Sequence, residues 1–363
     1  MKDAPIAILP PGATIRNDAG EVLLFSWPDF VATICEGAAC FICGRSKREV
    51  AFNDEHIVPN WALHAFGLHG KKVTLPNGQR TVYGNYTIPC CEPCNTEMAR
   101  RFEDDMSALV RAGPGAIHDH VAKGGGFQVF NWMALIFLKL HLKDRRLKMH
   151  LDRRLGDDPI SAGYIWENMH HLHAVARAFH IGATVQGEAT GSLYVFPIDA
   201  APDAFDLLTF TEAQTLYIQL GTTGLIAVFD DAHAATNRVM WIIERITGPL
   251  SPFQGRNMAV HYAMANLDLE NRPRFYTLIS EDRTRVTIGG SVGAAPIFRP
   301  YDPALFGDLM SAAFPVLPAV NDLDPEEARA RLASGDMNFL LDEQNRFVAD
   351  HARRSGLVLP PDE

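Results

Sequence analysis

The residues with the clearest chemistry lie between positions 40 and 95 of this 363-residue chain. Two Cys-x-x-Cys pairs, Cys40/Cys43 and Cys91/Cys94, are separated by 47 residues. Each pair is a tight turn that directs two thiolates at one point, and four thiolates form the donor set of a tetrahedral structural zinc ion. The sequence therefore predicts a Zn²⁺ site that closes a long loop. Reduced structural thiols without a metal are the alternative.

An acid-histidine dipeptide, Glu55-His56, lies inside this loop, and Asn95 directly follows the last cysteine. This ordered set resembles the HNH, or ββα-metal, endonucleases. It is most similar to the zinc-stapled branch that includes phage recombination endonuclease VII. The resemblance covers roughly residues 38–105, which is less than a third of the chain. It implies a small module of strand, strand and helix with zinc at its base, in which the metal supplies much of the stability.

The resemblance also implies roles for individual residues. Hydrolysis of a phosphodiester by in-line attack of water needs a base and a cation. A neutral imidazole suits the base because its pKa lies near the working pH, and His56 would have this role. Glu55 and Asn95 would hold a catalytic Mg²⁺ or Mn²⁺, since these hard cations prefer oxygen ligands. Asn85 would steady the loop behind the histidine.

Each of these residues has a plainer interpretation as well. Asn95 could cap the helix that follows it, and Asn85 could be a turn residue after a glycine. His56 could be a core or loop histidine in a zinc-binding interaction module. The family more often has Asp at the position of Glu55, and the extra methylene changes the geometry of the metal site. Asn85 lies six residues before Cys91, a longer spacing than is usual in the family.

Composition limits the setting in which this chemistry takes place. All six cysteines lie within the first 94 residues, which favours a metal site in a reducing, cytoplasmic compartment over a secreted disulfide scaffold. Cys35 and Cys90 remain as small buried residues, although Cys90 could replace Cys91 as a ligand. We expect no membrane span, because no long apolar run lacks charges, and no secretory signal, because no apolar segment follows a basic start.

The net charge of −10 is unusual for a protein that binds nucleic acid. The local balance differs, since residues 44–101 carry a net charge of +3 and residues 139–154 one of +5. Because local charge determines contact with phosphates, DNA remains an expected and salt-sensitive partner. The run 139–154 is either a solvated helix end or a grip on the phosphate backbone.

The elements around the motif predict an α+β protein. We expect a lead-in at 1–37, the zinc-stapled nuclease module at 38–112, and a larger mixed domain with an antiparallel sheet at 113–363. Hydrophobic patterns predict the following segments: strands near 48–56, 86–89, 192–196, 207–210, 215–220, 225–229, 275–279 and 285–288; helices near 60–67, 95–109, 129–142, 161–180, 236–246 and 257–267; a loop or hairpin at 67–85; and a mostly helical last 60 residues ending in a polar tail. The segment 161–180 carries histidines at 170, 171, 173 and 180, which are interpreted as incidental, since His170 and His173 lack acidic or cysteine partners nearby.

Three functional hypotheses follow. The leading one is a metal-dependent DNA endonuclease, with residues 113–363 serving recognition, oligomerisation or binding of a regulatory ligand or partner. A homodimer would suit double-strand cleavage, because one active site cuts one strand. The second is a non-catalytic zinc-stapled module that binds nucleic acid or protein. The third places an active site in residues 110–363, where no motif names a chemistry.

Overall fold

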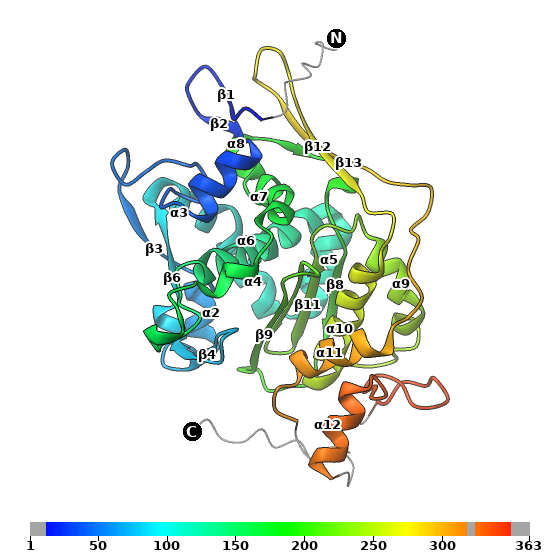
Figure 1. The fold of residues 1–363 in the computed structure, drawn as a ribbon. Coiled ribbons are helices and arrows are strands. Elements are labelled where there is room, and N and C mark those ends of the chain that lie inside the picture. The colour runs from blue at the N-terminus through cyan, green and yellow to red at the C-terminus, as the bar shows by residue number, and fades with distance from the viewer. Residues whose placement is uncertain (1–11, 318–323, 350–363) are drawn as a thin grey trace. The chain divides into compact units, whose positions relative to one another are not determined.

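The computed structural model describes residues 12–317 and 324–349, which form two compact units assembled from separate stretches of chain (Figure 1). Of the described residues, unit 1 comprises 12–111, 120–190 and 273–291, and unit 2 comprises 112–119, 191–272, 292–317 and 324–349. These units differ from the predicted domains. The lead-in and the stretch 120–190 belong to the same unit as the cysteine motif, because the segments after residue 120 pack against that motif. Mixed helices and mostly antiparallel sheets make the protein α+β, as expected.

Unit 1 consists of short strands and several helical segments. Its elements in chain order are β1 (Ile15–Arg16), β2 (Val22–Leu24), α1 (Trp27–Asp29), η1 (Phe30–Cys35), β3 (Phe52–His56), α2 (Asn60–Ala65), β4 (Lys72–Thr74), β5 (Arg80–Val82), η2 (Tyr83–Asn85), β6 (Thr87–Cys91), α3 (Glu92–Met98), η3 (Ala99–Glu103), α4 (Asp104–Ala112), η4 (Val121–Gly125), α6 (Gly126–Asp144), η5 (Arg153–Leu155), η6 (Ile160–Gly163), η7 (Trp166–Met169), α7 (His170–Ala176), α8 (Ala178–Ile181), β7 (Thr184–Val185), η8 (Gly187–Ala189), β12 (Arg274–Ile279) and β13 (Val286–Ser291).

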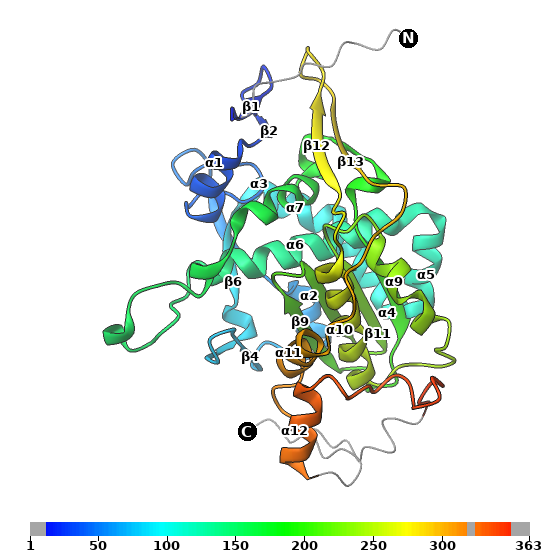
Figure 2. The same ribbon diagram turned by 45° about the vertical axis from the view of Figure 1, so that its right-hand side comes forward.

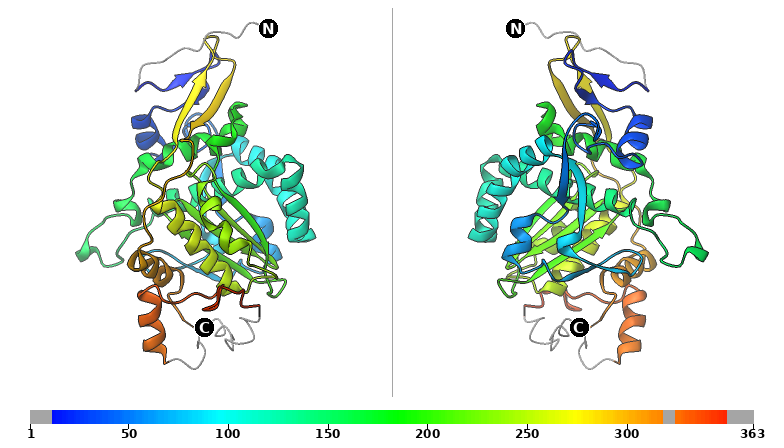
Figure 3. Two further views of the ribbon diagram at one scale, coloured as in Figure 1. Left: turned by 90° about the vertical axis from the view of Figure 1, so that its right-hand side faces the viewer. Right: turned by 90° about the vertical axis from the view of Figure 1, so that its left-hand side faces the viewer.

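Strands β3 and β6 form the antiparallel pair on which the motif is built (right-hand view of Figure 3). Glu55 lies opposite Ile88 and His56 lies opposite Thr87 in this pair. β6 leads directly into α3, whose first residues are Glu92 and a proline, a residue well suited to the first turn of a helix. The predicted order of strand, strand and helix is therefore confirmed, as are the short helix α2 and the β4–β5 hairpin between the two strands.

Helix α6 is the central helix of unit 1 and packs against α7 and β6 (Figure 2). Its residues from Val129 to Leu142 are all buried, which is the pattern of a helix covered on every side. The helix ends at Asp144, so the basic run does not continue it as we predicted. Lys139 is buried and Lys143 donates a hydrogen bond to the Thr87 carbonyl, so these two cations have partners inside the unit.

The segment 161–180 is less regular than the single helix that its apolar spacing predicts. It consists of η6, η7, α7 and α8, and Ile165 is 63% exposed instead of buried. Each of its four histidines has a hydrogen-bond partner: His170 pairs with the Phe25 carbonyl, His171 with that of Ala189, His173 with that of Phe41, and His180 with the Glu97 carboxylate. These histidines have structural roles, which agrees with their interpretation as incidental to metal binding.

Unit 2 is built on a four-stranded antiparallel sheet with the order β8-β11-β10-β9. Its elements are β8 (Leu193–Pro197), β9 (Phe205–Phe210), β10 (Thr215–Leu220), β11 (Thr223–Val228), α9 (Ala234–Ile243), α10 (Pro252–Asp268), α11 (Pro303–Ala313) and α12 (Pro325–Ala333), with most of α5 (Pro114–His120). Helix α10 packs against β10 and β11, and α9 and α11 pack against α10 (left-hand view of Figure 3). The predicted antiparallel sheet is therefore confirmed.

Helix α10 begins five residues earlier than the predicted start at 257. Ser251 and Gln254 form a capping box, in which each side chain bonds the backbone N–H of the other residue. The described residues after 302 form α11 and α12 and are irregular at 314–317 and 334–349, and the predicted polar tail lies outside the described residues. Within residues 12–317 and 324–349, no helix combines the length and apolar character needed to cross a membrane.

Candidate metal centre and candidate active site

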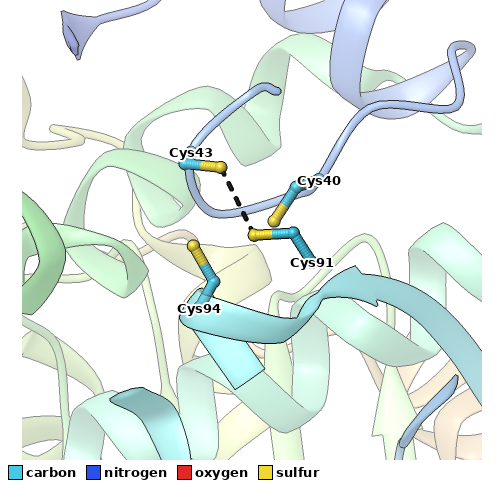
Figure 4. A group of neighbouring side chains, drawn as sticks. All are labelled: Cys40, Cys43, Cys91 and Cys94. Atoms are coloured by element: carbon cyan, nitrogen blue, oxygen red, sulfur yellow. Dashed lines mark hydrogen bonds between the residues drawn. The ribbon is translucent and has the colours of Figure 1, made fainter. Parts of the chain in front are cut away.

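The four predicted zinc ligands meet at one point in unit 1 (Figure 4). Cys40 and Cys43 lie in the loop before β3, Cys91 ends β6, and Cys94 lies in the first turn of α3. Their sulfur atoms all lie within 4.8 Å of one another, and the Sγ atoms of Cys43 and Cys91 are 3.6 Å apart. Zinc–sulfur bonds of about 2.3 Å in a tetrahedron place the sulfurs about 3.8 Å apart. The arrangement therefore fits a four-coordinate zinc ion.

Backbone hydrogen bonds fold the first cysteine pair into its turn. The Cys40 N–H donates to the Arg45 carbonyl at 2.8 Å, and the Gly44 N–H donates to the Cys40 carbonyl at 2.8 Å. Gly44 has a φ of +78°, and a Cβ added there would lie 2.6 Å from the ring of Phe25. The turn thus requires glycine directly after Cys43, both for its left-handed backbone and for its close contact with the aromatic ring.

The thiols influence one another's ionisation strongly. Hydrogen bonds from the neighbouring thiols, Cys43 first, hold the pKa of Cys40 well below its ordinary value. The hydrogen bond with Cys40, followed by burial, raises the pKa of Cys91, and hydrogen bonds with Cys40 and Cys43 raise that of Cys94. Four thiolates this close together therefore require a cation to offset their charge.

Two arginines provide positive charge beside the cluster. Four thiolates around one Zn²⁺ leave a net charge of about −2. Arg45 donates from Nε to the Cys43 sulfur at 3.4 Å. Arg177 is 2% exposed and donates to the carbonyls of Ile42, Val22 and Leu23 at 2.7, 2.6 and 3.1 Å. Burial lowers the pKa of Arg177 to about 10, and the nearby thiols oppose this shift. Arg177 therefore fixes the cysteine turn and offsets the charge of the centre.

The two remaining cysteines lie outside the metal-binding group. The Cys90 sulfur is 3.8 Å from that of Cys40 but does not belong to the group of four, because adjacent residues of β6 point to opposite faces. This geometry favours Cys91 over Cys90 as the ligand. Cys35 is buried, and burial is the main cause that raises the pKa of its thiol.

Glu55, the predicted ligand of the catalytic metal, has a different partner. Its carboxylate Oε1 lies 2.7 Å from the ammonium Nζ of Lys139 on α6. The two side chains are 9% and 3% exposed, so the ion pair is buried. The same Nζ donates to the carbonyl of His56 at 2.8 Å. Lys139 thus binds both residues of the acid-histidine dipeptide.

Asn95 is also engaged with a neighbour. Its side-chain Nδ2 donates to Asn53 Oδ1 at 2.8 Å, which ties α3 to β3. It does not cap the helix, because α3 begins at Glu92 and its N-cap residue is Cys91. Asn53 and Glu55 lie on the same face of β3, two residues apart. Glu55 therefore bonds to the Lys139 ammonium and Asn95 bonds to Asn53 through its amide nitrogen, and neither contact brings the two side chains together.

His56 is half-buried at the end of β3, on the opposite face of the strand from Glu55. Its ring lies edge to face with that of His69, with centroids 6.5 Å apart, and His69 contacts His64 at 4.4 Å in the same way. The Gly84 N–H donates to the His69 carbonyl at 3.4 Å. Asn85 is exposed at the end of η2, next to Gly84. The structure therefore groups His56 with two histidines that the motif did not indicate.

A small cavity of about 10 Å³ lies beside the Glu55–Lys139 pair. Glu103 lines it together with Met98, Phe102 and Trp132. Burial raises the pKa of Glu103, and the nearby Lys139 opposes this shift. Sequence reasoning missed Glu103 and Lys139 as neighbours of Glu55, because both lie on later helices with no motif of their own.

Comparison with known proteins adds no relative. No protein-family model matches the chain, and no curated protein or solved structure is significantly similar to it.

Proposed function

We propose that this protein is a DNA endonuclease that hydrolyses phosphodiester bonds, with His56 as the general base. One observation carries the proposal: a strand pair leading into a helix is held by a four-cysteine centre, and His56 lies at the end of the first strand. A half-exposed imidazole can accept a proton from an attacking water, since its ordinary pKa lies near neutral pH.

The zinc ion has a structural role in this proposal. All four of its ligands are cysteines, so its coordination sphere is closed and offers no position for a substrate or water. Bound there, zinc would fix the start of α3 relative to the loop before β3. The resemblance assigns Mg²⁺ or Mn²⁺ to Glu55 and Asn95. Because those side chains are engaged with Lys139 and Asn53, we derive no catalytic step from that ion.

Positive side chains near the strand pair support DNA as the substrate. Arg146 and Lys148 follow α6 and are exposed, and Lys72 and Arg80 are exposed on the β4–β5 hairpin. The Asn77 side chain of that hairpin donates to the Lys148 carbonyl at 2.9 Å, which joins the two basic segments. Contacts from these groups to phosphates would make binding weaken steeply with salt.

Nicking of a supercoiled plasmid by the purified, zinc-loaded chain tests the proposal, with Mg²⁺, Mn²⁺ or no added cation. His56→Ala should lower the rate by about 10²- to 10⁴-fold, the usual contribution of a general base. His64→Ala is the matched control, because this exposed histidine belongs to the same aromatic group but lies outside the motif. Equal nicking by His56→Ala and the unchanged protein would refute the proposal.

A second function is a zinc-stapled module that binds nucleic acid or protein without cutting. The observation that favours it is the buried ion pair between Glu55 and Lys139, which engages the acid of the motif. Under this alternative the protein binds DNA in a gel-shift assay, or captures a protein, but never nicks a plasmid. His56→Ala would then leave the measured affinity unchanged.

A further inference from the structure

We infer that the Lys139 ammonium takes the place of a metal ion at Glu55. Glu55 then binds a divalent cation only when this ammonium is absent. The inference rests on the proposed function only in assigning Glu55 to the nuclease site. It concerns which cation this carboxylate holds, a property that can be measured without cleavage.

The ammonium group of Lys139 contacts both residues of the Glu55-His56 dipeptide. Nζ lies 2.7 Å from Glu55 Oε1 and 2.8 Å from the His56 carbonyl oxygen. The Lys139 ammonium therefore neutralises the Glu55 carboxylate and also gives the His56 carbonyl oxygen a hydrogen-bond donor. A divalent cation approaching Glu55 would meet a positive charge within hydrogen-bond distance of its ligand, in a buried setting where like charges repel strongly.

The space beside Glu55 is too small for a hydrated metal ion. The adjoining cavity has a volume of about 10 Å³, which is close to the room that one water molecule needs. Mg²⁺ requires about six oxygen ligands in an octahedron and keeps several waters. Apart from the carboxylates of Glu55 and Glu103, the side chains that line the cavity with Lys139 are apolar and offer no oxygen. The arrangement therefore suits an ammonium group on a side chain and not a hydrated metal.

Loss of the ammonium would reverse this preference. Glu55 and Glu103 both line the cavity with Lys139, so without that lysine two carboxylates would share one small space. Burial raises the pKa of Glu103, since a buried carboxylate loses its hydration. An added cation would offset the negative charge of both carboxylates.

A purely structural ion pair predicts a different behaviour. In that case any loss of Lys139 destabilises the fold by leaving Glu55 without a partner, and Mn²⁺ in solution makes no difference. If Lys139 takes the place of a metal, Mn²⁺ should restore the stability that the variant loses. The effect of Mn²⁺ on the stability of the variant thus distinguishes a structural ion pair from a lysine that takes the place of a metal.

The experiment uses the zinc-loaded full chain with Lys139→Gln, which removes the charge and keeps a group that can donate to the His56 carbonyl. Lys143→Gln is the matched control, because this lysine lies one turn later on α6 and donates to the Thr87 carbonyl at 2.8 Å. Mn²⁺ binding is followed by electron paramagnetic resonance and thermal unfolding by circular dichroism. Zinc content, measured in parallel, verifies that each variant is folded around its metal centre.

Lys139→Gln should gain a Mn²⁺ site at least tenfold tighter than any in the unchanged protein, and Mn²⁺ should raise its melting temperature. Adding Glu55→Gln to this variant should abolish the gain, whereas Lys143→Gln should behave like the unchanged protein. Should Lys139→Gln lose its zinc, Lys139→Met provides a second variant of nearly equal length. Glu55-dependent Mn²⁺ binding of equal affinity in the unchanged protein would overturn the inference, and so would a folded Lys139 variant that gains no site.

Failure of the inference is distinguishable from failure of the proposed function. If the Mn²⁺ site appears as expected but no protein nicks DNA, the cation assignment stands and the nuclease proposal falls. If the unchanged protein nicks DNA and Glu55→Gln abolishes both nicking and Mn²⁺ binding, the nuclease proposal stands and the inference falls.

Discussion

Removal of one cysteine ligand gives the most direct test of the metal centre. Cys91→Ala deletes a sulfur that lies 3.6 Å from that of Cys43, and 47 residues separate the two along the chain. A cross-link that closes a loop of this length restricts the unfolded chain by about 4 kcal/mol. Because whole domains are stable by only about 5–15 kcal/mol, this loss is a large fraction of the total.

Cys90→Ala is the matched control for this change. Cys90 is adjacent in sequence, equally buried, and lies outside the group of four. We expect about one zinc ion per chain in the unchanged protein and in Cys90→Ala, and none in Cys91→Ala after dialysis against a chelator. The melting temperature of Cys91→Ala should fall by about 10 °C, as a loss of about 4 kcal/mol implies for a unit of this size.

Zinc content by mass spectrometry and thermal unfolding by circular dichroism measure both effects. Equal zinc loss in the two variants would show that Cys90 also serves as a ligand. Full zinc occupancy in Cys91→Ala would refute the four-cysteine centre altogether. If both variants lacked zinc and matched the stability of the unchanged protein, the cysteines would be structural thiols.

Three further outcomes follow from the packing. Arg177→Met leaves three carbonyls without their donor and removes charge beside the thiolates, so zinc affinity in a chelator competition should fall about 10- to 100-fold. Burial raises the pKa of Asp144 to about 6 from its ordinary 3.8, so its contribution to stability is complete at low pH and is lost as the pH rises through 6. Asp144→Asn should therefore gain about 1 kcal/mol relative to the unchanged protein between about pH 5 and about pH 7 in urea unfolding. Ser251→Ala removes the cap of α10 and should cost about 1 kcal/mol in the same assay.

Each of these outcomes has a contrary result. Unchanged zinc affinity in Arg177→Met would show that the arginine only fills space. A stability difference for Asp144→Asn that is independent of pH would mean that this carboxyl does not titrate with unfolding. Ser251→Thr, which keeps a capping hydroxyl, should retain more stability than Ser251→Ala, and equal losses would contradict the capping explanation.

Local features of the fold were readable from the sequence because their causes are local. A Cys-x-x-Cys turn, a proline in the first turn of α3 and a continuous apolar run in α6 act within a few residues. The strand-strand-helix order around the cysteines follows from such signals. The predicted start of α10 at 257 is wrong, because apolar spacing marks the buried face of a helix, whereas the capping box of Ser251 and Gln254 marks its first turn.

The surroundings of the candidate site were decided by the tertiary structure alone. Lys139 contacts Glu55 across 84 residues of sequence, and Arg177 contacts Ile42 across 135. Neither Lys139 nor Arg177 belongs to the cysteine motif, and the sequence does not indicate these contacts because they depend on how distant elements pack. The sequence by itself determined which four cysteines could bind a metal, because their spacing is a local property. Only the packing of α6 and α7 against the β3–β6 module decided which charges surround those residues, because burial and contact exist only in the folded chain.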